Sequence, residues 1–397
     1  MARVVTGSRW AAIVGYSLVG AATQLVWLNF AGVTTVAAAH YGVSESAIGW
    51  LAQVFPLLYV LLALPCGLIL DRWFRSGLLL GAALTALGAC LRLIGDDFGW
   101  LLAGQIVASI AQPLVLNAVT GITGRYLSPR HRPTGIAVGT ASIFAGMMIA
   151  FILDAVFTTG DSLSTMLTVT AIYCVVAALI LTVALRNEGP HAPAAATPSP
   201  DRGALEIAWG DPLIRRLCVL AIFPFGVFVA MTTFAQALLE PAGVSGGTAS
   251  TILLITVIAG VLGSAIIPIV VVRRNAESAL LVLSLTVTSI ACIVLAFAPG
   301  VLTGFLAITL IGLLLLPALP IVLELVERRT GEAEGTAAGL IWMSGNLGGL
   351  LVATAVGLLV DHPTAAFLLM AVIPLIAVPG ARALRRPIAE LRAQPQP

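Results

Sequence analysis

The chain has 397 residues, of which 59% are hydrophobic and only 10% are charged, and its formal net charge is +2. Soluble domains average about 45–50% apolar and about 25% charged residues, so this composition excludes an ordinary soluble fold. It indicates a polytopic membrane protein, and the charge balance leaves no basic domain for nucleic acid.

A membrane-crossing helix needs about 20 mostly apolar residues, and a hydropathy window of about that length predicts twelve spans. The first apolar run has no A-x-A-like cleavage site close behind a short core, so it is interpreted as a helix and not as a signal peptide. The twelve predicted spans, in chain order, are residues 10–39, 46–70, 76–95, 98–124, 133–158, 162–186, 213–238, 247–272, 277–298, 301–326, 333–360 and 364–385.

The sixth and seventh spans are separated by "RNEGPHAPAAATPSPDRGALEIAWGD", which is rich in Pro, Ala and charge and cannot cross a membrane. We therefore expect an all-α membrane protein of twelve transmembrane helices in two pseudo-symmetric six-helix halves. The expected parts are an N-terminal bundle at 1–186, a cytoplasmic linker at 187–212, a C-terminal bundle at 213–386 and a cytoplasmic tail at 387–397.

The basic residues set the expected orientation, because all 20 are arginines and nearly all fall in alternate loops and at the two ends of the chain. The positive-inside rule places that side in the cytoplasm, so both termini are expected there. The opposite loops hold acidic residues, and Arg92 is the one arginine near that side. We expect a multi-pass protein of the inner (plasma) membrane.

Catalytic and metal-binding patterns are missing from the sequence. The five cysteines have unrelated spacings and each lies in a predicted span, which favours reduced packing residues. The four histidines lie in loops or at helix ends without ligand spacing, and no nucleophile elbow, Walker loop or acid pair at one depth is present. We expect no enzyme activity, no metal and no cofactor.

The segment "GLILDRWFRSGLLLG", which follows the second span, resembles the signature loop G-x-L-x-D-R-x-G-R-R of the major facilitator superfamily. Phe74 replaces the usual Gly, and a single following arginine remains. The resemblance agrees with two six-helix halves, and it implies a charge latch at the cytoplasmic face. A bland snorkelling loop is the alternative interpretation. The expected latch residues are Gly67, Asp71, Arg72 and Arg75, with Glu324, Glu327 and Arg328 at the cytoplasmic end of the tenth span.

Three longer stretches resemble the feline leukaemia virus subgroup C receptor (FLVCR) family. They begin "WLNFAGVTTVAAAHYGVS" at Trp27, "GQIVASIAQPLVLNAV" at Gly104 and "PIVLELVERRTGEAEGT" at Pro320. The resemblance is strongest in the first four spans and in the tenth and eleventh. It implies a facilitative carrier for choline or ethanolamine, with separate haem-related roles for some members.

Polar and indole groups inside a span need a partner or a watery cavity, so they are candidate substrate ligands. An aromatic face holds an ammonium group without a buried carboxylate, and Trp27 offers that face. Gln112, before the expected bend at Pro113, offers an amide. Both residues match positions where the family binds substrate. The alternative is that Trp27 faces lipid or fills the core and that Gln112 bonds a neighbouring helix. Interhelical bonding is the stronger alternative for Asn29 and Asn117, which complete the first-half candidates.

The second half departs from the family. Val229 stands where the family offers a cation-binding Tyr, and Asn346 stands where it has Gln. Trp342 precedes Asn346 by one helical turn and is a candidate replacement ring, with core packing as the alternative. These differences weigh more against choline as the substrate than against the carrier architecture.

The candidates for proton coupling in the spans are Asp154, Glu324 and Glu327. They lie near helix ends, which favours downhill transport by alternating access over proton coupling. The main alternative is a proton-coupled multidrug or metabolite efflux antiporter of the same superfamily. A substrate-sensing receptor with a carrier fold and an integral-membrane enzyme are further alternatives. The expected partners are a small-molecule substrate and the lipid bilayer, with the protein a monomer.

Overall fold

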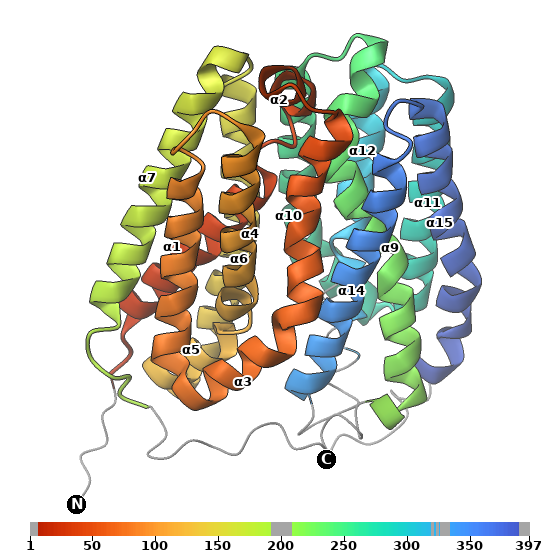
Figure 1. The fold of residues 1–397 in the computed structure, drawn as a ribbon. Helices are drawn as coiled ribbons and strands as arrows, with labels where there is room; N and C mark the ends of the chain where they lie inside the picture. Colours follow the sequence, from red (N-terminus) through yellow and green to blue (C-terminus); the bar gives the residue numbers. More distant parts are fainter. Residues whose placement is uncertain (1–6, 192–208, 319–320, 323–324, 326–333, 389–397) are drawn as a thin grey trace, which may run out of the picture. The chain divides into compact units, whose positions relative to one another are not determined.

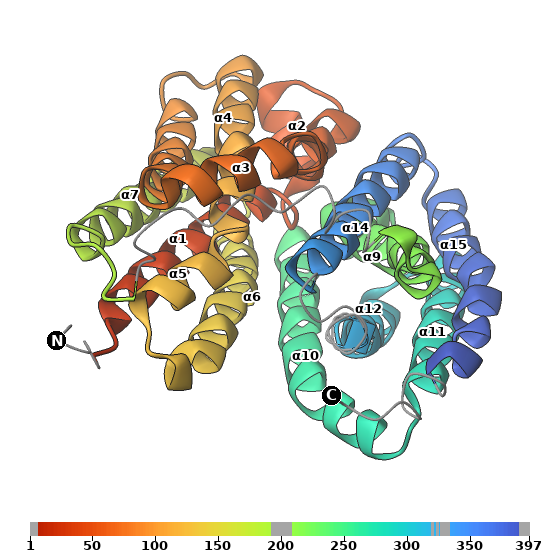
Figure 2. The same ribbon diagram turned by 90° about the horizontal axis from the view of Figure 1, so that it is seen from below.

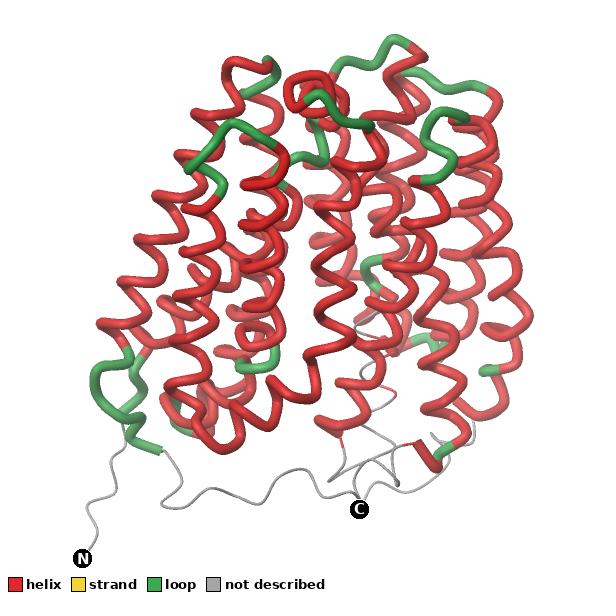
Figure 3. The backbone as a smooth tube through the Cα atoms, viewed as in Figure 1, coloured by secondary structure: helices red, strands yellow, loops and turns green. Residues whose placement is uncertain are grey.

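The computed structural model describes residues 7–191, 209–318, 321–322, 325 and 334–388. These described residues form helices joined by turns, and they contain no strand (Figure 3). In this part of the chain eleven helical segments are long and apolar enough to cross a membrane. The all-α membrane fold expected from composition is confirmed.

Most predicted spans correspond to one helix with ends within three residues of the expected ones. The helices are α6 (Arg132–Val156), α7 (Gly160–Ala184), α9 (Pro212–Leu239), α10 (Gly246–Arg273), α11 (Glu277–Phe297), α14 (Glu334–Gly357) and α15 (Pro363–Ala383). Helix α12 (Val301–Leu315) covers only the first part of the predicted span 301–326, and Leu316 and Pro317 form a turn after it.

The second and third predicted spans are joined in one long helix, α3 (Glu45–Leu91). Trp73 is the single non-helical position inside it, with φ −133° and ψ 57°. The expected loop at residues 71–75 is therefore a kink. No Pro or Gly stands between Asp71 and Arg75 to stop the helix.

The first and fourth predicted spans are each interrupted. The first consists of α1 (Trp10–Leu28) and α2 (Thr34–Tyr41), with turns between them. The fourth consists of α4 (Phe98–Leu116) and α5 (Val119–Tyr126), and the break falls at Asn117, four residues after Pro113. A hydropathy window detects apolar length, so it does not detect breaks of a few apolar or amide residues.

The chain forms two compact units. Unit 1 holds residues 1–29, 36–43 and 57–199, and unit 2 holds residues 30–35, 44–56 and 200–397. In unit 1, α1 contacts α4, α5, α6 and α7 (Figures 1 and 2). Its apolar core includes Ile13 and Tyr16 of α1 and Leu181 of α7, all nearly inaccessible to solvent.

The first described residues of the predicted linker belong to unit 1. The backbone N–H of His191 donates to the carbonyl of Arg125 at 3.0 Å, and the Arg9 guanidinium donates to the carbonyl of Glu188 at 3.1 Å. The Tyr126 hydroxyl donates to the carbonyl of Asn187 at 3.2 Å. These bonds tie the chain after α7 to the end of α5 and to the start of α1.

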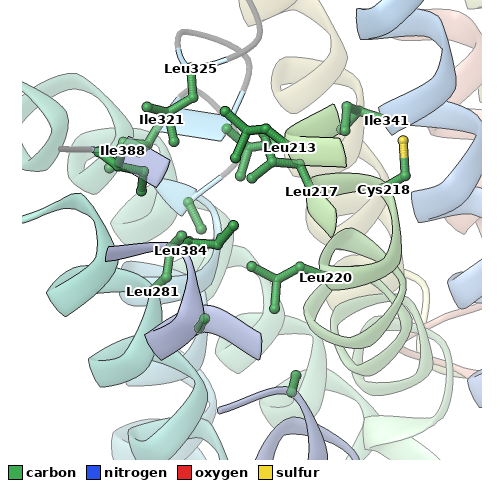
Figure 4. Packing of buried hydrophobic residues seen from close by; sticks show 14 of the residues in the cluster. Leu213, Leu217, Cys218, Leu220, Leu281, Ile321, Leu325, Ile341, Leu384 and Ile388 are labelled. Carbon is green, nitrogen blue, oxygen red and sulfur yellow. The ribbon is translucent and has the colours of Figure 1, made fainter. Parts of the chain in front are cut away.

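In unit 2, the helix pairs α9 with α14, α11 with α15, and α10 with α12 lie side by side. One apolar cluster fills an end of this unit, with side chains from α9, α11, α14 and α15 (Figure 4). Leu217 of α9, Leu281 of α11, Ile341 of α14 and Leu384 at the C-cap of α15 are each at most 4% exposed. This cluster holds α9 and α14, which bear the second-half candidate residues.

Glycines allow the closest helix contacts. A Cβ added at Gly348 of α14 would meet the backbone carbonyl oxygen of Ile222 on α9. In unit 1, a Cβ at Gly146 of α6 would meet the backbone of Ala21 on α1 in the same way. Small residues at helix interfaces are how membrane helices gain packing energy where lipid removes the usual hydrophobic drive.

The Gly348 contact predicts a stability difference. Gly348→Ala should force α14 away from α9 and destabilise the fold by about 1–3 kcal/mol, as overpacking typically does. Gly380→Ala in α15 is the matched control, because a Cβ there meets nothing within 4 Å. Thermal unfolding in detergent should show a lower melting temperature for Gly348→Ala alone. Equal melting temperatures for the two variants would contradict this packing.

Candidate functional site

The two main candidates of unit 1 are both buried. Trp27 lies in the last turn of α1 and is 6% exposed, and Gln112 lies in α4 directly before Pro113 and is 3% exposed. Helices α1 and α4 are in contact. Both side chains are therefore enclosed by other parts of the chain, which argues against the alternative that Trp27 faces lipid.

Asn29 and Asn117 both lie where a helix ends. Asn29 is the C-cap of α1, and its Oδ1 accepts a hydrogen bond from Arg92 Nη2 at 3.0 Å. Asn117 is the C-cap of α4, where its Oδ1 accepts from the Tyr59 hydroxyl at 2.8 Å and its Nδ2 donates to the Ala63 carbonyl at 3.3 Å. In this structure both amides support the breaks in their helices.

Phe74, which replaces the usual glycine of the signature loop, is buried. Phe74 is 8% exposed and packs against Gly121 of α5, where a Cβ would collide with its ring. The Arg125 guanidinium lies 4.2 Å from the centre of the Phe74 ring. A cation–π contact thus joins the kink in α3 to α5 in place of the missing Gly and Arg.

The expected latch residues are only partly described. Arg72 and Arg75 are exposed, and the Arg72 guanidinium lies 4.7 Å from the Trp73 ring centre. A Cβ at Gly67 would meet nothing within 4 Å, so no close helix contact at this position requires glycine here. The side chain of Asp71, and all of Glu324, Glu327 and Arg328, lie outside what the structure describes.

The candidates of unit 2 lie on one stretch of α14. The Asn346 side chain is 8% exposed, and its Nδ2 donates to the carbonyl of Trp342 at 2.9 Å. Trp342 is half-buried and meets Phe225 of α9 edge to face, with ring centres 6.1 Å apart. Phe225 was missed by sequence reasoning, although it lies one turn before Val229 on the same helix.

Val229 is fully buried between helices. Its exposed fraction is 0%, and a Cβ added at Gly349 of α14 would lie 3.1 Å from its Cγ2. A valine fits this narrow space, whereas a phenol ring at position 229 would have to displace α14. The aromatic surface of this region is instead supplied one turn away, by Phe225 and Trp342.

Two buried glutamines, Gln53 of α3 and Gln236 of α9, were also missed by sequence reasoning. Gln53 Nε2 donates to Thr233 Oγ1 of α9 at 3.3 Å. Gln236 Nε2 donates to Thr35 Oγ1 at 2.8 Å and to Glu240 Oε2 at 2.7 Å. All five residues belong to unit 2. An amide in a predicted span was the available signal, but a hydropathy profile does not identify its partner.

Two ionisable groups are wholly enclosed in unit 1. Asp154 near the end of α6 is 0% exposed, and Arg92 directly after α3 is 2% exposed. Burial lowers the pKa of Arg92 to about 10, so the guanidinium remains charged at neutral pH. The sequence placed Arg92 in the third predicted span, near its end on the acidic side, whereas the structure places it directly after α3 and buries its charge.

These buried amides and indoles between apolar helices are the features of a membrane carrier, and a comparison with known families identifies which one. The family model of the Major Facilitator Superfamily matches residues 12–353. The chain belongs to this superfamily. It is therefore a membrane transporter, as the signature loop and the two six-helix halves predicted.

Curated relatives of this transporter have modest identity. Solute carrier family 49 member A3 of Danio rerio is 26% identical over 360 residues, covering 85% of this chain and 76% of the relative. The choline/ethanolamine transporter FLVCR2 of Homo sapiens is 26% identical over 391 residues, covering 90% and 73%. The resemblance to the FLVCR family read from the motifs is confirmed.

Solved structures support the fold. A mutant of the peptide transporter POT in complex with alafosfalin superposes with a TM-score of 0.78 at 13% identity, covering 97% of this chain and 96% of that one. A bacterial homologue of the human lysosomal transporter Spinster gives 0.75 at 15% identity, covering 98% and 99%. At such identities the likeness concerns the fold alone.

The packing around Val229 predicts what happens when this residue is replaced by the Tyr of the family. Val229→Tyr should destabilise this transporter, because the space against Gly349 holds no ring, and overpacking of this kind costs about 1–3 kcal/mol or more. Phe225→Tyr, one turn away and half-buried, is the control and should fold normally. Thermal unfolding of the two purified variants compares them, and a stable Val229→Tyr variant would disprove the tight fit.

Proposed function

We propose that this transporter moves a small organic cation, such as choline or ethanolamine, down its electrochemical gradient by alternating access. The observation that carries the proposal is the buried indole of Trp27 in the last turn of α1. Relatives that bear the name choline/ethanolamine transporter support the same substrate class.

Cation–π attraction is the proposed chemistry of binding. A desolvated ammonium over an indole face gains about 2 kcal/mol or more, and a neutral ring avoids the expense of a buried carboxylate. Trp27 would take the ammonium, and the Gln112 amide would bond a substrate hydroxyl. In unit 2, Trp342 and Asn346 are the proposed substrate-binding residues, and Phe225 meets the Trp342 ring edge to face.

Alternating access is the proposed mode of transport, because carriers of this fold expose one site to each side in turn. Residues 30–35 and 44–56 belong to unit 2, although they precede most of unit 1 in the chain. Gly49 of α3 packs directly on the Phe234 ring of α9, where a Cβ would collide with it. Within unit 2, the bond between Gln53 and Thr233 adds to this contact.

A proton-coupled efflux antiporter is the second candidate, and Asp154 is the observation that favours it. An acidic residue wholly buried in a membrane helix is by default a functional hypothesis. The two candidates differ in energetics. Choline flux that is insensitive to collapse of the proton gradient supports the facilitative carrier, whereas flux that follows the proton gradient supports the antiporter.

The substrate proposal predicts that replacing Trp27 weakens the binding of a charged substrate more than the binding of a neutral analogue. Trp27→Ala should weaken choline binding by about 1–2 kcal/mol, about five- to thirtyfold, and Trp27→Phe should retain part of it. Binding of 3,3-dimethylbutan-1-ol, the neutral analogue of choline, should change much less. Calorimetric titration of the purified protein measures each affinity.

The control for this experiment is Trp100→Ala, because Trp100 is 40% exposed near the start of α4. It should leave both affinities unchanged. Choline binding that is indifferent to Trp27→Ala, or an equal loss for the neutral analogue, would reject the cation–π site.

The orientation is also a proposal, and it rests on the one-sided arginines. With the native cysteines replaced, a cysteine at Asp361 should react with an impermeant maleimide in intact cells, and a cysteine at Arg202 should react only after lysis. Labelling of both positions under the same condition would reject cytoplasmic termini with twelve spans.

A further inference from the structure

Arg92 is an unusual residue for the interior of a membrane protein. It follows the last residue of α3 and is 2% exposed. Its lowered pKa shows that burial disfavours the charged form more than its surroundings compensate. The guanidinium is held in this buried position by hydrogen bonds to neighbouring side chains.

The hydrogen bonds of Arg92 lead to the last turn of α1. Its Nη2 donates to Asn29 Oδ1 at 3.0 Å, and its Nη1 donates to Gln105 Oε1 at 3.4 Å. Gln105 Nε2 in turn donates to the backbone carbonyl of Val26 at 3.2 Å. The network therefore holds α1 at Val26 and at Asn29, the residues that lie one before and two after Trp27.

This turn needs support from outside the helix. The last carbonyls of any helix lack the N–H partners of a continuing helix, and the Val26 carbonyl lies in the last turn of α1. Turns occupy residues 29–33 after it. In an apolar environment an unbonded carbonyl is costly, and Gln105 satisfies the carbonyl of Val26.

We propose that Arg92 and Gln105 are positioning residues that fix the last turn of α1 and thereby aim the Trp27 indole at the substrate cation. This inference rests on the proposed function, in which Trp27 binds the cation. The planar guanidinium suits the role because two of its nitrogens donate to two amides in fixed geometry, which a lysine ammonium does not reproduce.

A double-mutant cycle on choline binding tests the proposal. Arg92→Met should weaken choline binding at least threefold when Trp27 is present, and it should change binding less than 1.5-fold in the Trp27→Ala background. Arg92→Lys should fall between the wild type and Arg92→Met. Affinity for the neutral analogue 3,3-dimethylbutan-1-ol should change less than affinity for choline.

The matched control is Thr85→Val on α3. Thr85 is 1% exposed, and its hydroxyl bonds only within its own helix, to the carbonyl of Gly81 at 2.9 Å. It should leave choline affinity unchanged. If Arg92→Met does not yield folded protein, Gln105→Met, which frees the carbonyl of Val26, replaces it in the same cycle with the same expected result.

The outcomes separate the two proposals. Equal weakening in the wild-type and Trp27→Ala backgrounds means that Arg92 acts independently of Trp27, and it overturns the positioning role while leaving the substrate proposal intact. Loss of choline affinity in Thr85→Val equal to that in Arg92→Met also overturns it. Choline binding that Trp27→Ala does not affect rejects the cation–π site itself, and the positioning role falls with it.

Discussion

Every polar group inside a bilayer must find its partner within the protein, and the structure of this transporter follows from that constraint. Unbroken helices satisfy it along most of the chain. Where α1 ends, the Gln105 side chain bonds the Val26 carbonyl. Where α4 ends, the Asn117 side chain joins this end to α3, through the Tyr59 hydroxyl and the Ala63 carbonyl. The two breaks follow the helical segments that hold the candidates Trp27 and Gln112.

Close helix packing supports these polar positions. At Gly348 and Gly146 the backbones of neighbouring helices approach so closely that no side chain fits. The same close approach of the helices limits which side chains fit between them. Val229 is enclosed beside Gly349, and no ring fits there. The aromatic surface of unit 2 is formed instead by Phe225 and Trp342, one turn away. Packing thus determines which positions on α9 and α14 carry large side chains.

Neutral rings and amides, not carboxylates, dominate the candidate site. Such groups bind a cation through the ring quadrupole and through hydrogen bonds, and they release it without a strong ion pair to break. A carrier needs this balance because the same site must load and unload. The charge of Arg92 lies apart from it in the proposed scheme, where its role is to hold α1. Asp154 is the buried acid on which the competing proton-coupled scheme depends.

The sequence by itself determined the membrane class, the positions of most helices and the superfamily, because apolar length and the motif from Gly67 to Gly81 are local properties of the chain. It also singled out Trp27 and Gln112 as buried candidates. Only the tertiary structure decided the breaks at Asn29 and Asn117, the continuous α3 and the burial of Arg92. The physical reason is that hydropathy sums over neighbours in sequence, whereas a buried polar group is stabilised by partners distant in the chain. Arg92 and Asn29 are 63 positions apart, so their bond exists only after folding.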